Sequence, residues 1–282
     1  MISAVYGQPL FQSFKRQFEK YNLPVYASAE SAVIALSTLH KRKIIVDQIS
    51  IWSEDKKPVS SSPEAEDWQG GLPRSVDEMA FKKFLREQQV RVPKSLLLHN
   101  LSDIQKAAGE LGFPLVLKAV SPEIKHKTEL GGVRVGIDSL PELVRSWNAM
   151  RKSCPYPIWA EQEMPPGLDL MVGFHRDPNF GPVLIFGAGG QYVEIMRDTV
   201  RLLLPASRRE IARMVAKTGV GKIIDGVRGE PALNKNDLIK FMDLACRWMV
   251  RSPLIQSVDF NPVRLYPDRL VVLDAKLDLR RE

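Results

Sequence analysis

Cysteine and histidine are scarce in this sequence. Its 282 residues include two cysteines, Cys154 and Cys246, and four histidines. Two cysteines cannot build a disulfide framework, and no cysteine–histidine spacing typical of a zinc site is present. The expected location is therefore the reducing cytoplasm.

Long hydrophobic runs are also missing. No stretch approaches the roughly 18 apolar residues of a membrane helix, and the amino terminus lacks the apolar core of a secretory signal, so we expect no membrane association. The sequence contains neither a Walker loop nor a nucleophile elbow. What remains is an ordinary globular composition, 44% hydrophobic and 26% charged.

The charge is unbalanced but spread out. Forty basic and 33 acidic residues give a net charge of +7, which attracts anions in general. The basic residues form only short, distant clusters, and no aromatic-plus-basic signature of an RNA-reading sheet occurs. Nucleic acid is therefore not the expected partner.

Composition divides the chain into three segments. Residues 1–51 predict a helix, a short strand and a second helix capped by Ser28, a unit too small to bury its own faces. Residues 52–74, rich in serine, proline, glycine and charge, are typical of a linker. At Ser75 a capping-box pattern opens a helix, and elements then alternate through residue 282.

The segment 75–282 predicts a mixed α/β fold. The expected further helices are 103–111, 141–151, 208–217 and 236–250, and the expected strands are 95–99, 114–120, 133–138, several between 157 and 204, and a hairpin at 255–277. Because several strands follow one another without a helix, we expect these strands to pair antiparallel. The expected fold class is therefore mixed α/β, of the α+β kind in which antiparallel sheets are covered by helices.

One lysine interrupts an apolar strand, and a basic loop follows it. Lys118 follows the apolar residues Leu115–Leu117 and precedes Ala119 and Val120. A charge on such a strand costs desolvation free energy unless the ammonium reaches water or an anion. An edge strand with a snorkelling lysine explains the pattern equally well. The next loop carries His126 between two lysines, which would attract phosphate, although a solvated basic loop is also compatible.

A glycine turn and a hairpin complete the candidate chemistry. Gly189 and Gly190 follow a buried strand, which fits close approach of a ligand or a plain hairpin turn.

Asp259 and Asn261 point to one face of a strand, and a turn centred on residues 267–268 would place Asp274 opposite Asn261. Such oxygen ligands suit Mg²⁺ bound with nucleotide phosphates, although turn-capping carboxylates are the alternative.

Four segments resemble, in this order, the ATP-grasp domain of the NDP-forming acyl-CoA synthetases. They are GFPLVLKAVSPEIKHKTELGGV, EMPPGLDLMVGFHRDPNFGP, IFGAGGQYVE and VDFNPV…VLDAKL. These enzymes are the ADP-forming acetate–CoA ligases, relatives of succinyl-CoA synthetase. The resemblance implies a grasp fold over 75–282, with lobes at about 75–162 and 163–282 and a nucleotide between them. Residues 1–51 resemble the end of the preceding CoA-ligase domain.

The resemblance also implies roles for individual residues. Lys118 matches the lysine that contacts the nucleotide phosphates, and His126 matches a phosphate carrier on a mobile loop. Asn261 and Asp274 match the Mg²⁺ ligands, with Asp259 beside them. The remaining expected nucleotide-binding residues are Glu161, Gln162, Glu163 and Met164 in the adenine linker, together with Asp169, Gly189 and Gly190.

The function that the resemblance implies is that of a nucleotide-binding β subunit. It would pass a phosphoryl group between a phosphohistidine and ADP or ATP, with Mg²⁺, and would need a separate CoA-binding α subunit in a hetero-oligomer. Leu202 stands where relatives usually have arginine, and Ser257 where they commonly have glutamate. These departures favour an alternative, a degenerate grasp module with a scaffolding or regulatory role. A grasp-fold carboxylate–amine ligase is a third reading, which the His126 loop argues against.

Overall fold

A computed structural model gives the fold of two separate units, Met1–Ala65 and Glu66–Glu282, each described here by itself. The described residues are 3–4, 15, 17–18, 20–21, 25–26, 28–37, 39–40, 77–120, 132–190, 198–227 and 229–280. None of the helices in these ranges is long and apolar enough to cross a membrane.

The first unit holds a short strand pair and a helix. Strands β1 (Ser3–Ala4) and β2 (Val25–Tyr26) pair in parallel. The helix that follows β2 begins after Ser28, whose hydroxyl oxygen accepts a hydrogen bond from the Ser31 amide at 3.1 Å, so the predicted cap is confirmed.

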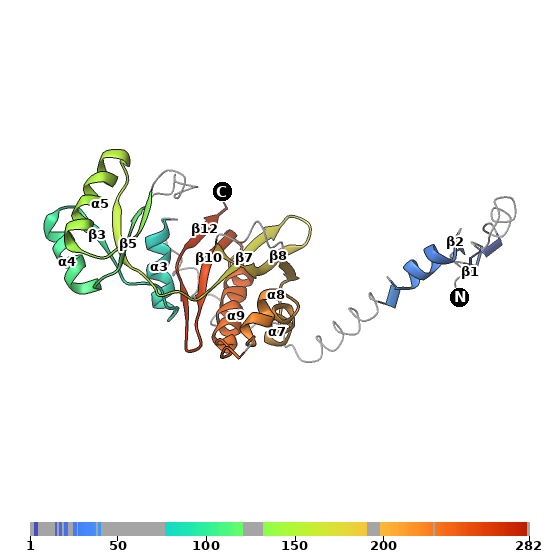
Figure 1. The fold of residues 1–282 in the computed structure, drawn as a ribbon. Coiled ribbons are helices and arrows are strands. Elements are labelled where there is room, and N and C mark those ends of the chain that lie inside the picture. Colours follow the sequence, from blue (N-terminus) through green and yellow to red (C-terminus); the bar gives the residue numbers. More distant parts are fainter. Residues whose placement is uncertain are drawn as a thin grey trace. The chain divides into compact units, whose positions relative to one another are not determined.

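The second unit contains a small lobe built on a four-stranded antiparallel sheet (Figure 1). Its order is β3 (Ser95–Leu98), β6 (Ile158–Gln162), β4 (Leu115–Ala119) and β5 (Val133–Ile137). Helices α4 (Leu101–Leu111) and α5 (Leu140–Ser153) share a buried apolar core with one face of this sheet. Because side chains alternate along a strand, the opposite face carries Val116, Lys118 and Glu161.

The large lobe contains the longer sheet and the larger core (Figure 1). Antiparallel pairing joins β10 (Ile255–Leu265), β7 (Leu168–Asp177), β8 (Gly181–Ala188) and β9 (Thr199–Leu203), as the strand succession predicts. Both β11 (Leu270–Val272) and β12 (Ala275–Leu279) pair with β10. Helices α7 (Arg208–Ala216), α8 (Gly219–Ile224) and α9 (Lys235–Arg251) pack on one face.

Helix α3 (Glu78–Glu87) also packs into the core of the large lobe. The Phe81 ring stacks on Phe260 of β10 with centroids 5.7 Å apart. The capping box predicted at Ser75 is wrong, because the N-cap is Asp77, whose carboxylate accepts from the Ala80 amide at 2.8 Å. Asp and Ser are equally good N-cap residues, and this helix is capped by Asp77, two residues after Ser75.

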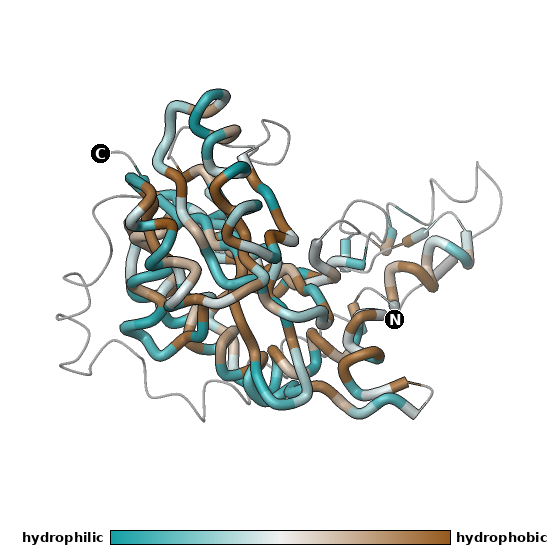
Figure 2. The backbone as a smooth tube through the Cα atoms, turned by 60° about the vertical axis from the view of Figure 1, so that its left-hand side comes forward, coloured by the Kyte–Doolittle hydropathy of each residue, from teal (hydrophilic) through white to brown (hydrophobic). Residues whose placement is uncertain are grey.

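Hydropathy follows this layering. Figure 2 shows hydrophobic and hydrophilic stretches alternating along the helices of the second unit. That alternation is what a helix needs when one face covers a sheet and the other meets water.

Arg176 of β7 closes the end of helix α9. Its guanidinium donates to the carbonyl oxygens of Met249 at 2.5 Å, Ser252 at 3.0 Å and Ile255 at 3.1 Å. The last carbonyls of a helix have no intrahelical partner, and a cation there also complements the helix dipole. Burial lowers the pKa of Arg176, but the guanidinium remains charged.

We predict that Arg176→Ala destabilises the large lobe. Three carbonyl oxygens would lose a charged donor, and hydrogen bonds to charged groups contribute about 1.5–3 kcal/mol. The expected change is a fall in melting temperature of roughly 4–8 °C, measured by thermal unfolding. The control is Arg209→Ala, which truncates an exposed arginine on α7. Equal melting temperatures for the two variants would contradict this role of Arg176.

Candidate functional site

Four charged side chains meet where the small lobe contacts α3, and we call them the buried charge cluster: Glu78, Lys82, Lys118 and Glu161. The Lys82 ammonium lies 2.8 Å from Glu78 Oε1 and 2.5 Å from Glu161 Oε1. The Lys118 ammonium lies 3.3 Å from Glu78 Oε1 and 2.6 Å from Glu161 Oε2. It also donates to the Leu273 carbonyl oxygen at 2.9 Å. The cluster therefore joins α3, both central strands of the small sheet and the large-lobe hairpin.

Lys118 is held in its charged form. Burial by itself lowers the pKa of a lysine, but the carboxylates of Glu78, Glu161 and Asp274 more than offset this effect. The pKa of Lys118 is therefore raised above its ordinary value. Lys118 lies on an interior strand and pairs with carboxylates, so an edge lysine that reaches only toward water does not describe it.

The hairpin of β10 with β11 and β12 has the predicted register. Phe260 pairs with Ala275 and Val263 with Val272. Continuing the same register places Asn261 opposite Asp274, and the Asp274 carboxylate is close enough to affect the pKa of both Lys118 and Asp259.

These side chains fit a magnesium ion. Burial raises the pKa of Asp259, the Lys276 ammonium lowers it, and the nearby Asp274 carboxylate raises it, with a net increase. Two carboxylates that disfavour each other's charge are stabilised by a cation between them. No group of three or more His, Cys, Asp or Glu ligands occurs among the described residues. Asp259, Asn261 and Asp274 offer two carboxylates and an amide oxygen, a donor set that suits Mg²⁺, which takes one or two carboxylates and completes its shell with phosphate and water.

The glycine turn lies beside the hairpin. The Gly190 amide donates to Asn261 Oδ1 at 3.1 Å, and the Gly189 amide donates to the Asp169 carbonyl oxygen at 2.9 Å. A Cβ on Gly189 would overlap backbone atoms of Leu170, and Gly190 has a φ of +69°. Both positions require glycine, because only glycine allows this approach and this conformation without strain.

Asp169 is committed to an ion pair. Arg264 donates to it bidentately, with Nε 2.7 Å from Oδ1 and Nη2 3.0 Å from Oδ2. The hydrogen bonds to Asp169 raise the pKa of Arg264. Arg264 Nη1 also donates to the Met164 carbonyl oxygen at 3.0 Å. Asp169 therefore orients the linker between the lobes through Arg264.

The side chains of the predicted adenine linker, residues 161–164, lie in different surroundings. The Glu161 side chain belongs to the buried charge cluster and is only 3% exposed. The Glu163 carboxylate accepts from the Gly136 amide at 2.6 Å. Gln162 and Met164 line a pocket of 390 Å³. Thus the Glu161 and Glu163 carboxylates make structural contacts, while Gln162 and Met164 face open space.

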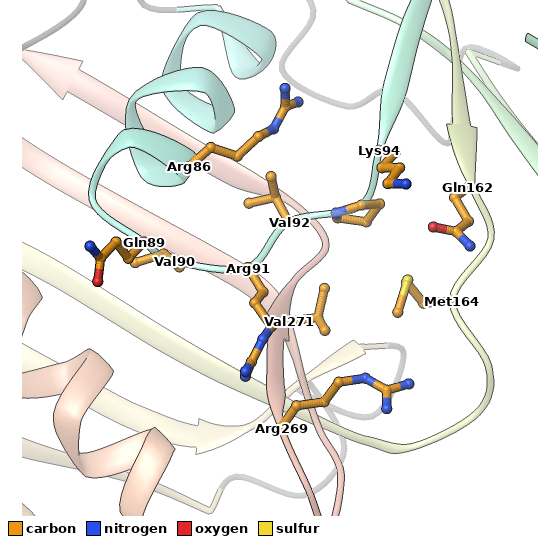
Figure 3. Close-up of a pocket in the computed structure, with 11 residues that line it drawn as sticks. Arg86, Gln89, Val90, Arg91, Val92, Lys94, Gln162, Met164, Arg269 and Val271 are labelled. Carbon is orange, nitrogen blue, oxygen red and sulfur yellow. The ribbon is translucent and has the colours of Figure 1, made fainter. Parts of the chain in front are cut away.

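Figure 3 shows this pocket between the linker and the segment that follows α3. Gln162 and Met164 stand on the linker side, and Val271 lies on the hairpin side. Among the residues that the structure describes, four cations and no carboxylate line it: Arg86, Arg91, Lys94 and Arg269. Its size is that of a small-molecule site, and its charge suits an anionic ligand.

His126 lies outside the residues that the structure describes, as does the rest of the segment 121–131. The two ends of that segment are placed. The Ala119 amide donates to the Gly132 carbonyl oxygen at 2.8 Å, and Lys118 pairs with Val133. The connection that carries His126 therefore leaves and rejoins the small sheet next to Lys118.

The departure at Leu202 has a structural explanation. Pairing between β8 and β9 is unbroken from Thr199 to Leu203, so no bulge shifts the faces. Leu202 packs against the large core. One row of directly opposed residues crosses the other face: Lys276, Asp259, Gly173, Ile185 and Arg201. Arg201 therefore shares the face of Asp259, and the chain keeps an arginine on that face.

Ser257 is paired with a carboxylate of its own. Its hydroxyl lies 2.8 Å from Asp278 Oδ2 on the neighbouring strand. Asp278 thus supplies a negative charge beside the position where glutamate is expected.

Comparison with known proteins agrees with this geometry. Residues 72–279 match the family model described as an ATP-grasp domain. The chain is 30% identical over 214 residues to the β subunit of ADP-forming acetate–CoA ligase I from Pyrococcus furiosus, covering 73% of this chain and 92% of that subunit. It is 28% identical over 274 residues to the ADP-forming 4-hydroxybutyrate–CoA ligase of Nitrosopumilus maritimus, of which it covers 36%.

A solved relative has the same fold. Acetyl-coenzyme A synthetase 1 of Candidatus Korarchaeum cryptofilum matches with a TM-score of 0.67 and 30% identity over 76% of this chain and 97% of that one. The chain therefore belongs to the ATP-grasp family, in the group that contains the β subunits of ADP-forming acetate–CoA ligases. It spans nearly all of such a β subunit and about a third of the single-chain relative.

Sequence reasoning missed three contributors to the site. Glu78 and Lys82 are separated by one helical turn, a spacing that is usual for an exposed ion pair, and only their full burial reveals the cluster. Arg264 sits two residues from a proline in a strand, and nothing local indicates its partner Asp169. All three depend on tertiary contacts.

Replacement of Gly189 by alanine should disrupt both the fold and the site. The new methyl group would collide with the Leu170 backbone in the central strand β7, and the Gly190–Asn261 contact would shift. We expect a loss of more than about 2 kcal/mol of stability. Gly109→Ala is the control, since a Cβ there meets nothing within 4 Å on an exposed helix face and should stabilise slightly. A Gly189→Ala protein with unchanged melting temperature would refute the close-approach argument.

Proposed function

We propose that this chain is the nucleotide-binding β subunit of an ADP-forming acyl-CoA synthetase. It would interconvert acyl-CoA, ADP and phosphate with carboxylate, CoA and ATP, together with a CoA-binding α subunit. The observation that carries the proposal is the convergence of Lys118, Asn261 and Asp274 where the two lobes meet. The Pyrococcus relative is itself a β subunit, which supports a partner for this chain.

The nucleotide would lie between the lobes with its base toward the linker. The backbone of the linker 161–164 would hold the base, and the phosphates would extend toward Lys118. A related synthetase has been solved with Mg-AMPPCP, which supports a magnesium–nucleotide complex as ligand. Asp259, Asn261 and Asp274 would hold the Mg²⁺, which when bound neutralises phosphate charge.

The phosphoryl group would travel through His126. A terminal phosphate oxygen of ADP attacks the phosphorus of phosphohistidine, the P–O bond forms, the P–N bond breaks, and the imidazole nitrogen keeps the bonding electron pair. The Lys118 ammonium offsets the negative charge that gathers on the transferred group. The anchored ends of the 121–131 segment beside Lys118 support this placement of His126.

Two observations weaken the alternative of a degenerate module with a scaffolding role. It rested on Leu202 and Ser257, but Arg201 shares the face of Asp259, and Asp278 stands beside Ser257. The ligase subunit is therefore the function that the geometry supports best.

Titration of the chain with ADP and Mg²⁺ by calorimetry tests the proposal. We expect micromolar binding, weakened at least about tenfold by Lys118→Ala because a charge-assisted contact to phosphate is lost. The matched control is Lys83→Ala, which truncates an exposed lysine on α3 and should leave binding unchanged. Absence of binding at millimolar nucleotide in the wild-type chain would overturn the proposal.

A further inference from the structure

Lys82 is the least exposed member of the buried charge cluster, and no step of the phosphoryl transfer uses it. Its side chain is 0% exposed, against 12% for Lys118. It therefore cannot reach a nucleotide, whereas Lys118 can. A lysine buried to this degree costs desolvation free energy, and replacing buried ion pairs by apolar residues is often neutral or stabilising. Stability alone is thus a weak reason for a lysine at this position.

The geometry shows what Lys82 does to Lys118. Both ammonium groups contact Glu78 Oε1, and each contacts one oxygen of Glu161. Two carboxylates are therefore shared between two lysines. Without Lys82, the Lys118 ammonium would face both carboxylates alone, and a phosphate would have to compete with two negative charges for one cation.

We propose that Lys82 is a positioning residue for nucleotide binding: it neutralises the carboxylates of Glu78 and Glu161 and so keeps the Lys118 ammonium available to phosphate. Glu161 and the Leu273 carbonyl oxygen, at 2.6 and 2.9 Å, fix where Lys118 points, and Glu78 is farther away at 3.3 Å. Lys82 sets how much of the Lys118 charge remains for a ligand. This inference rests on the proposed function, because it assigns to Lys118 a phosphate partner.

The members of the buried charge cluster come from both lobes, so the surroundings of the Lys118 ammonium depend on how the lobes are placed. Glu78 and Lys82 stand on α3, which packs into the large core through Phe81. Lys118 and Glu161 stand on β4 and β6 of the small sheet. Lys82 on α3 thus acts on Lys118 of the small lobe through carboxylates that both lysines contact.

Three variants separate this role from a structural one. Lys82→Met removes the charge and keeps most of the side-chain volume, Glu78→Gln removes a carboxylate and keeps its shape, and the double variant restores the net charge of the cluster. Binding of ADP with Mg²⁺ is measured by calorimetry, and folding is checked by thermal unfolding.

We expect Lys82→Met to weaken ADP binding on the order of tenfold, Glu78→Gln to bind as tightly as the wild-type chain or more tightly, and the double variant to recover to within about threefold. A purely structural cluster predicts the opposite pattern, with both single variants weaker and the double variant weakest. If Lys82→Met does not fold, Glu78→Gln decides: unchanged or tighter binding supports the proposal, and weaker binding overturns it.

Measurements on the wild-type chain and on Lys118→Ala distinguish failure of the proposed function from failure of the proposed role of Lys82. A wild-type chain that does not bind ADP refutes the proposed function. A wild-type chain that binds ADP, loses it in Lys118→Ala and keeps full affinity in a folded Lys82→Met refutes the role of Lys82 alone.

Discussion

The contact of Lys118 with Glu161 and with the Leu273 carbonyl oxygen is the interaction on which the site depends. It joins the small sheet to the hairpin of the large lobe at one ammonium group. Lys118 is buried enough to interact strongly and exposed enough to reach a ligand. Because both lobes fix the same atom, the distance between the Lys118 ammonium and the hairpin that carries Asn261 and Asp274 follows from the fold.

The hairpin and the glycine turn meet that cation from the large lobe. Asn261 lies opposite Asp274 in the hairpin register and accepts from the Gly190 amide, so one side chain connects the hairpin with the glycine turn. Arg264, three residues further along β10, holds Asp169 and the Met164 carbonyl oxygen. A single strand thus contacts the glycine turn, Asp169 and the interlobe linker.

Much of this could be predicted from the sequence because it depends on local patterns. Strand alternation and a turn at residues 267–268 were enough to place Asn261 opposite Asp274, and the structure has that register. The antiparallel large sheet followed from the succession of strands. Helix α8 was not predicted, because six residues with two glycines carry no helical period and the helix is stabilised by its cap Thr218 and by core burial. The buried charge cluster was also missed, since burial of Lys82 is set by packing against the other lobe.

The proposed phosphoryl transfer is tested most directly by asking whether His126 receives the γ-phosphate of ATP. The purified chain is incubated with Mg²⁺ and γ-labelled ATP, quenched in alkali and mapped by peptide mass. We expect an acid-labile label on the His126 peptide, discharged by added ADP and absent from His126→Ala. A chain that binds ATP but carries no label, or carries it on another residue, would rule out His126 as the phosphate carrier.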